Sequence, residues 1–139
     1  MAFYQVSGPV NTQWFPKKAS TVMAVGSALT FDGSGYVTNA TSTSTRVAGV
    51  NLKTIASTDS DYAATTLIPV HFPGSQAIFL ADVGSGTATA ANIGVQYDFN
   101  DATGVNLGAS SHKQVTVVGV IDASHVLVTL AAYTFANAS

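Results

Sequence analysis

The stretch QVTVVGVIDASHVLVTLAAY, residues 114–133, decides the fold class of this chain. It belongs to the most apolar part of the sequence, and its length alone would suit a membrane-spanning helix. Asp122, Ser124 and His125 stand at its centre, where a membrane helix tolerates polar groups least. Valine dominates both flanks, and valine favours strands. The stretch therefore predicts a long β-hairpin, with strands over 114–121 and 125–133 and a turn between them.

The composition extends the β prediction to the whole chain of 139 residues. Charged residues make up only 9%, and every acidic residue is an aspartate. Glutamate, lysine and arginine normally solvate the outer face of an amphipathic helix, so their scarcity argues against helices. The apolar fraction of 47% is large enough to build a hydrophobic core. We expect a soluble all-β domain.

From residue 19 onward, short apolar runs alternate with turn residues, as is typical of a β-barrel or β-sandwich. The sequence Asp32-Gly-Ser-Gly35 predicts a hairpin turn, because glycine adopts positive φ at little cost. Further strands are expected over 21–25, over 46–52 with a bulge or bend at Gly49, over 67–72 with Pro69 indicating a sheet edge or a strand start, and over 76–83 and 94–99. Residues 57–64 are the one stretch whose sequence suits a short helical turn. The predicted fold is a small β-barrel or β-sandwich of about eight to ten short strands.

Residues 1–18 differ from the rest and are expected to form an extended N-terminal arm, followed by a single β-domain over 19–139. Burying the four large aromatic side chains of the arm would release about 15–25 kcal/mol. Ordering its backbone would cost about 16–32 kcal/mol, so the arm is marginal alone and should settle on a partner. The candidate partner contacts are Phe3, Tyr4, Trp14 and Phe15. A second interpretation stays open, in which the segment completes its own barrel as a first strand.

Net charge and cysteine content exclude several partners. The formal charge of −2 offers no basic patch for nucleic acid, so no nucleic-acid partner is expected. With no cysteine in the chain, disulfides and thiolate metal sites are ruled out. The polar centre of residues 114–133 also argues against a membrane partner.

No motif predicts catalysis, a cofactor or a metal. The aspartates near 59–61 and 98–101 do not match a calcium-binding loop, and capping or turn roles explain them equally well. The histidines at 71, 112 and 125 lack the spacing of metal ligands. The Gly-Ser-Gly sequences at 33–35 and 84–86 lack the context of a nucleophile elbow or a phosphate loop. We predict a protein that is not an enzyme, with no catalytic, cofactor-binding or metal site.

Three stretches, KASTVMAVGSALTF (18–31), DGSGYVT (32–38) and VAGV (47–50), together with the preceding arm, resemble the decoration (cement) proteins of tailed bacteriophages. The resemblance implies a virion protein that clamps neighbouring major capsid proteins from the capsid exterior after synthesis in the host cytoplasm. It also implies a homo-oligomer, with a trimer favoured over a dimer, and capsid contact by strand addition from the N-terminal segment.

Two other functions fit the same composition. One is a different virion component, such as a tail, fibre or head–tail protein. The other is a carbohydrate-binding adhesin module, in which an aromatic side chain stacks on a sugar ring. The candidates for that stacking are Trp14, Tyr36, Tyr62 and Tyr97.

Overall fold

The structure is a computed structural model that describes residues 3–8, 11–72 and 77–130. Its regular elements are eleven β-strands and one 3-10 turn, so the all-β prediction is confirmed. In chain order they are β1 (Phe3–Ser7), β2 (Thr12–Pro16), β3 (Ala28–Phe31), β4 (Val37–Asn39), β5 (Val47–Asn51), β6 (Leu67–His71), β7 (Ile78–Ser85), η1 (Ala90–Asn92), β8 (Gln96–Asp101), β9 (Gly104–Asn106), β10 (Val115–Asp122) and β11 (His125–Leu130).

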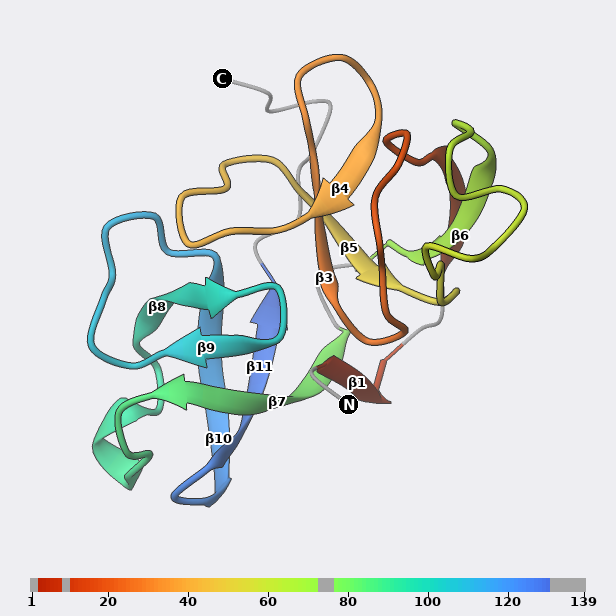
Figure 1. Ribbon diagram of the computed structural model, residues 1–139. Coiled ribbons are helices and arrows are strands. Elements are labelled where there is room, and N and C mark those ends of the chain that lie inside the picture. Colours follow the sequence, from red (N-terminus) through yellow and green to blue (C-terminus); the bar gives the residue numbers. More distant parts are fainter. Residues whose placement is uncertain (1–2, 9–10, 73–76, 131–139) are drawn as a thin grey trace.

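Six strands form the first sheet, in the order β1-β7-β11-β10-β8-β9. The last strand, β9, also pairs with β7 in parallel, so five of these strands close into a small barrel while β1 lies outside the ring. Figure 1 shows this barrel at the lower left, where β7 crosses β10 and β11 in this view. The barrel half of the fold prediction is therefore confirmed.

The second sheet has five strands, in the order β2-β6-β5-β3-β4. A bridge between Lys17 and Val37 brings the end of β2 to the start of β4, and the amide of Lys18 donates to the carbonyl of Val37. This bridge draws the two outer strands of the second sheet together. The sheet lies beside the barrel, at the upper right of Figure 1.

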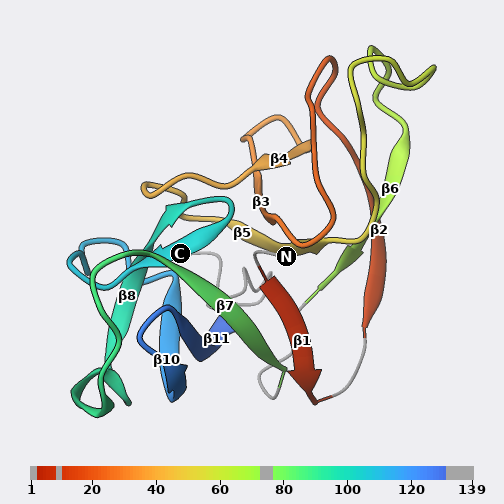
Figure 2. The same ribbon diagram turned by 60° about the horizontal axis from the view of Figure 1, so that its bottom comes forward.

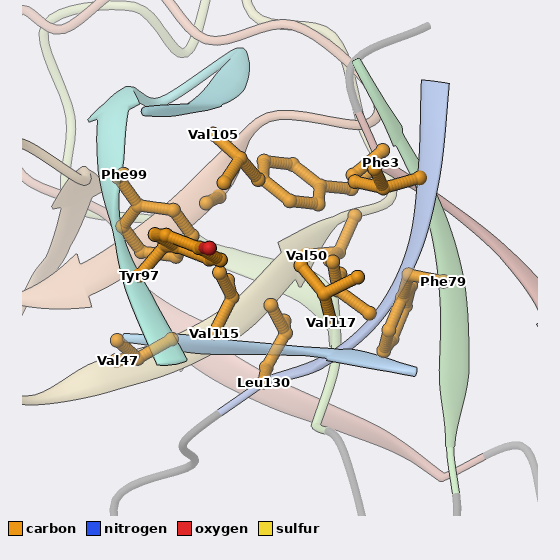
Figure 3. Packing of buried hydrophobic residues seen from close by; sticks show 14 of the residues in the cluster. Phe3, Val47, Val50, Phe79, Tyr97, Phe99, Val105, Val115, Val117 and Leu130 are labelled. Atoms are coloured by element: carbon orange, nitrogen blue, oxygen red, sulfur yellow. The ribbon is translucent and has the colours of Figure 1, made fainter. Parts of the chain in front are cut away.

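Strands β3 and β5 form a wall between two hydrophobic cores. Val47 and Val50 belong to the core that fills the barrel side, whereas Ala48 between them belongs to the core of the second sheet. On β3, Ala28 belongs to the core of the barrel side and its neighbour Leu29 to the core of the second sheet. Figure 3 shows the barrel-side core, where residues of β1, β5, β7, β8, β9, β10 and β11 converge. Every residue of β5 is buried because neighbours cover both of its faces.

Both predicted hairpins are present. Strands β10 and β11 pair across the turn at 123–124, as the opening stretch predicted for the residues that the structure describes. Strands β3 and β4 pair across residues 32–36, where Gly33 and Gly35 have φ of 90° and 94°. The predicted bulge at Gly49 is also found, since the β3–β5 register shifts between Leu29 and Thr30. Residue 76 and residues 131–133 of the predicted strands lie outside the described part of the chain.

Three local predictions are wrong. Residues 21–25 do not form a strand, because only Met23 makes a bridge, to Ile55. Residues 57–64 form successive turns rather than a helical turn. Strand β6 is not an edge strand, because it lies between β2 and β5, and Pro69 is its third residue rather than its start. Pro69 faces β5 at the point where that strand ends, and its carbonyl accepts the amide of Leu52, one residue beyond β5, at 3.1 Å.

Within the described ranges, no helix has the length and apolar character needed to cross a membrane.

Candidate functional site

The described part of the N-terminal segment forms two strands of this chain's own sheets. Strand β1 pairs with β7 from Phe3 opposite Ala81 onward, and β2 pairs with β6 from Thr12 opposite His71 to Pro16 opposite Leu67. Figure 2 shows β1 beside β7 and β2 beside β6. Both strands end their sheets. The described part of the segment therefore pairs with strands of its own chain, as in the second interpretation, but it adds an end strand to each sheet and does not enter the barrel ring.

Two of the four candidate aromatic residues lie in the cores. Phe3 is 1% exposed, and its ring packs edge-on against Phe99 with the centroids 5.5 Å apart. Phe15 is half-buried and packs edge-on against Phe31 at 5.1 Å. In this conformation Phe3 stabilises its own chain and offers no surface to a partner.

The other two aromatic residues point outward. Tyr4 is 55% exposed, and Trp14 is 59% exposed. Tyr4 shares its exposed region of β1 with Val6. Trp14 lies opposite Pro69 and Pro16 opposite Leu67, so that Trp14 and Leu67, both exposed, share one face of the second sheet. We call these two apolar regions, Tyr4 with Val6 and Trp14 with Leu67, the edge-strand faces.

The structure buries Asp98 on β8, between the buried residues Tyr97 and Phe99. Its carboxylate accepts the backbone amides of Ser111 at 3.1 Å, His112 at 2.7 Å and Lys113 at 2.6 Å. The imidazole Nδ1 of His112 lies 3.5 Å from the same carboxylate. Burial alone would raise the pKa of Asp98, but these donors outweigh it and lower the pKa. The carboxylate of Asp98 fixes the loop at residues 111–113 by accepting its backbone amides, so its role is structural.

An exposed histidine joins two carboxylates at the tip of the β10–β11 hairpin. The Nδ1 of His125 lies 2.8 Å from Asp122 Oδ1, and its Nε2 lies 3.5 Å from Asp82 Oδ1 on β7. The hydrogen bond from the His125 side chain lowers the pKa of Asp122. One ring nitrogen of His125 faces Asp122 in the hairpin and the other faces Asp82 on β7. The histidine therefore links the tip of the hairpin to β7.

No group of three or more His, Asp or Glu side chains that would hold a metal occurs in residues 3–8, 11–72 and 77–130. Asp59 and Asp61, considered as cation ligands, have other partners. Asp59 accepts the amide of Ala56 at 2.8 Å, and Asp61 lies 3.4 Å from the ammonium of Lys53. The Gly-Ser-Gly sequences lie in the β3–β4 turn and at the end of β7, so neither leads into a helix.

Comparison of the chain with protein-family models, with curated proteins and with solved structures finds no match.

Proposed function

We propose that this protein is a structural virion protein that binds the outer surface of an assembled phage capsid. In this role it stabilises the shell by bridging neighbouring major capsid proteins. The observation that carries the proposal is the pair of edge-strand faces, on which Tyr4 and Trp14 are each more than half exposed at the end of a sheet. An edge strand offers backbone groups for strand addition, and an adjacent aromatic side chain supplies an anchor for a pocket on the partner.

The low charge of the chain supports a role within an assembly, because a surface with few ions pays little desolvation on contact with a similar surface. The choice of the capsid as the partner and of a trimer as the oligomeric state comes from the resemblance to decoration proteins. With three subunits, each chain needs only modest affinity, since linked contacts multiply the strength of attachment.

Co-sedimentation with assembled, undecorated heads of tailed phages tests the proposal. We expect saturable binding at a fixed ratio to the coat protein, together with increased resistance of the heads to heat. Tyr4→Ser and Trp14→Ser should each weaken binding at least about tenfold, because truncating an interface aromatic anchor commonly has this effect. Ile121→Ser is the matched control, since Ile121 is 59% exposed but lies on β10, away from both edge strands.

Absence of binding to any intact head overturns the proposal. Equal binding by the wild type and by both aromatic variants overturns the role of the edge-strand faces. Saturation at only a few copies per particle replaces the decoration role by that of a tail, fibre or head–tail component. Point substitutions are preferable to deletion of the segment, because deletion would also remove Phe3 and Phe15 from the two cores.

The exposure of Trp14 also favours a second candidate, the carbohydrate-binding module. Its indole ring is free to stack on a sugar ring, whereas Tyr97 is 9% exposed and its hydroxyl is bonded to Asn92 at 2.7 Å. Saturable binding in a glycan screen that Trp14→Ala abolishes would favour this candidate over the capsid. A screen without any saturable ligand would remove it.

A further inference from the structure

A hollow of about 320 Å³ lies at one end of the second sheet, beside the β3–β4 turn. The described residues that line it are Phe15, Phe31, Gly33, Gly35 and Arg46. An adjoining hollow of about 350 Å³ shares three of these residues and is lined as well by Asp32 and Thr45. We call the two hollows together the Arg46 depression. A cavity of about 150 Å³ is enough to hold benzene, so the depression has room for a small ring.

One side of the Arg46 depression is apolar. The rings of Phe15 and Phe31 pack edge-on with their centroids 5.1 Å apart, and both lie against the buried core of the second sheet. Beside them, Gly33 and Gly35 have no side chains, and a Cβ at either position would meet no atom within 4 Å. The turn therefore leaves open space next to two rings whose positions are already fixed by packing.

The other side of the depression carries a cation. Arg46 is the only arginine in the chain, and its exposed side chain lines both hollows. Its backbone is held beside β3, because its carbonyl accepts the amide of Phe31 and the hydroxyl of Thr30, each at 3.0 Å. A guanidinium binds a carboxylate through two parallel hydrogen bonds, a geometry that few other groups match. The polar side of the depression therefore favours a carboxylate.

Asp32, which also lines the depression, is engaged in the β3–β4 turn. Its Oδ1 accepts the amides of Ser34 at 2.8 Å and Tyr36 at 3.2 Å. Asp32 and Arg46 both belong to the described part of the chain, and they form no ion pair with each other. A carboxylate that binds Arg46 therefore has no internal ion pair with Asp32 to break.

We propose that the Arg46 depression binds a small amphipathic carboxylate, a molecule with one ring or branched carbon chain and one carboxylate group. The carboxylate pairs with the guanidinium of Arg46, while the apolar part packs on Phe15 and Phe31. Small-molecule sites commonly lie at the mouths of β-barrels and combine apolar walls with a few polar groups, as this depression does. The site goes beyond the proposed capsid role and does not depend on it.

Benzoate and benzamide are matched probes, because they have nearly the same shape and differ in charge. Binding is measured by NMR titration of the full chain at low ionic strength. The backbone amides of Gly33 and Gly35 report binding in every variant, and the guanidinium Nε–H of Arg46 adds a single signal in the wild type. We expect saturable binding of benzoate that shifts all three signals, and weaker binding of benzamide. Acetate, which lacks the ring, should not saturate over the same range.

The variants separate the guanidinium from net charge. Arg46→Gln should lower the ratio of benzoate affinity to benzamide affinity about three- to tenfold, the value of a charge-assisted contact that is open to solvent. Lys53→Gln removes the same charge beyond the other end of β5, at a side chain that is 49% exposed, and should leave the ratio unchanged. Asp32→Asn removes a like charge from the depression and should raise the ratio.

Three outcomes overturn the proposal. The first is the absence of saturable benzoate binding up to about 10 mM, a range that covers millimolar dissociation constants. The second is an equal fall of the affinity ratio in Arg46→Gln and Lys53→Gln, because the effect would then come from net charge and not from this site. The third is a lower ratio in Asp32→Asn, which would place the carboxylate away from Arg46.

Discussion

The side-chain Nε2 of Gln114 donates a hydrogen bond of 2.8 Å to the carbonyl of Ser44, 70 residues away in the chain. The same nitrogen lies 3.0 Å from the carbonyl of Ser42, and the side-chain oxygen accepts the amide of Phe99 at 2.7 Å. Ser42 and Ser44 belong to the loop between β4 and β5, whereas Phe99 lies on β8. One buried amide thus joins the barrel to the second sheet.

Gln114→Ala should lower the free energy of unfolding by about 2–4 kcal/mol, because it leaves backbone groups of both sheets buried without partners. Urea denaturation measures this change, and the midpoint should fall while the slope stays constant. Gln13→Ala is the matched control, since Gln13 is exposed and bonds only to the side chain of Asn11 among the described residues. A loss below about 0.5 kcal/mol for Gln114→Ala would contradict the linking role.

A buried lysine fixes the loop that precedes β6. Lys17 is 0% exposed, and its ammonium donates to the carbonyls of Tyr62 and Ala64, each at 2.7 Å. Lys17→Met keeps the length of the side chain but leaves both carbonyls without this donor, so we expect a loss of at least about 2 kcal/mol in the free energy of unfolding. Hydrogen exchange over residues 56–66 should accelerate as well.

The neighbouring lysine provides the control for this prediction. Lys18 is exposed, so Lys18→Met removes the same charge without disturbing the buried carbonyls and should change stability by less than about 0.5 kcal/mol. Equal effects of the two substitutions would mean that charge, and not the buried hydrogen bonds, accounts for the result.

Local chemistry in the sequence predicted much of the fold. Valine-rich flanks and a polar turn predicted the β10–β11 hairpin, and the glycines at 33 and 35 predicted the β3–β4 turn, because both depend on residues close together in the chain. The edge position predicted for β6 was wrong because local rules do not show where the neighbouring strand ends. The sequence around Asp98 could not reveal that residues 111–113 fold over its carboxylate, because the two segments are separated along the chain.

The candidate site was predictable only in part. Aromatic content drew attention to residues 3–15, but which rings are buried depends on pairing with β6 and β7, and these strands lie more than 50 residues further along the chain. The Arg46 depression has no local sequence signal, because its described walls come from β2, β3, the β3–β4 turn and the residue before β5. A histidine within the apolar run 67–72 was the single hint that a polar side chain would be buried in β6.

Asp98 should make the free energy of unfolding depend on pH in the acid range. The pKa of its carboxyl is lower in the folded state than the ordinary value near 4, so the folded chain binds fewer protons than the unfolded chain. Its contribution is fully present above that ordinary value and is lost as the pH falls through the lowered pKa. Asp98→Asn should weaken the protein at pH 7 and flatten the acid side of the stability curve. Asp101→Asn, at an exposed carboxylate, is the control.

His71 should produce a second pH dependence at a higher pH. Burial lowers its pKa in the folded state, so between that lowered pKa and about 6.5 the unfolded chain binds more protons than the folded chain. Stability therefore falls as the pH drops below about 6.5, and the fall ends once the pH is below the pKa of the folded state. In His71→Phe this part of the curve should be absent, and the variant should exceed the wild type in stability at pH 5. Urea midpoints of the wild type and of His71→Phe, measured from pH 8 to pH 5, provide the measurement. If the curve of His71→Phe parallels the wild type across this range, the imidazole of His71 is not the group that titrates.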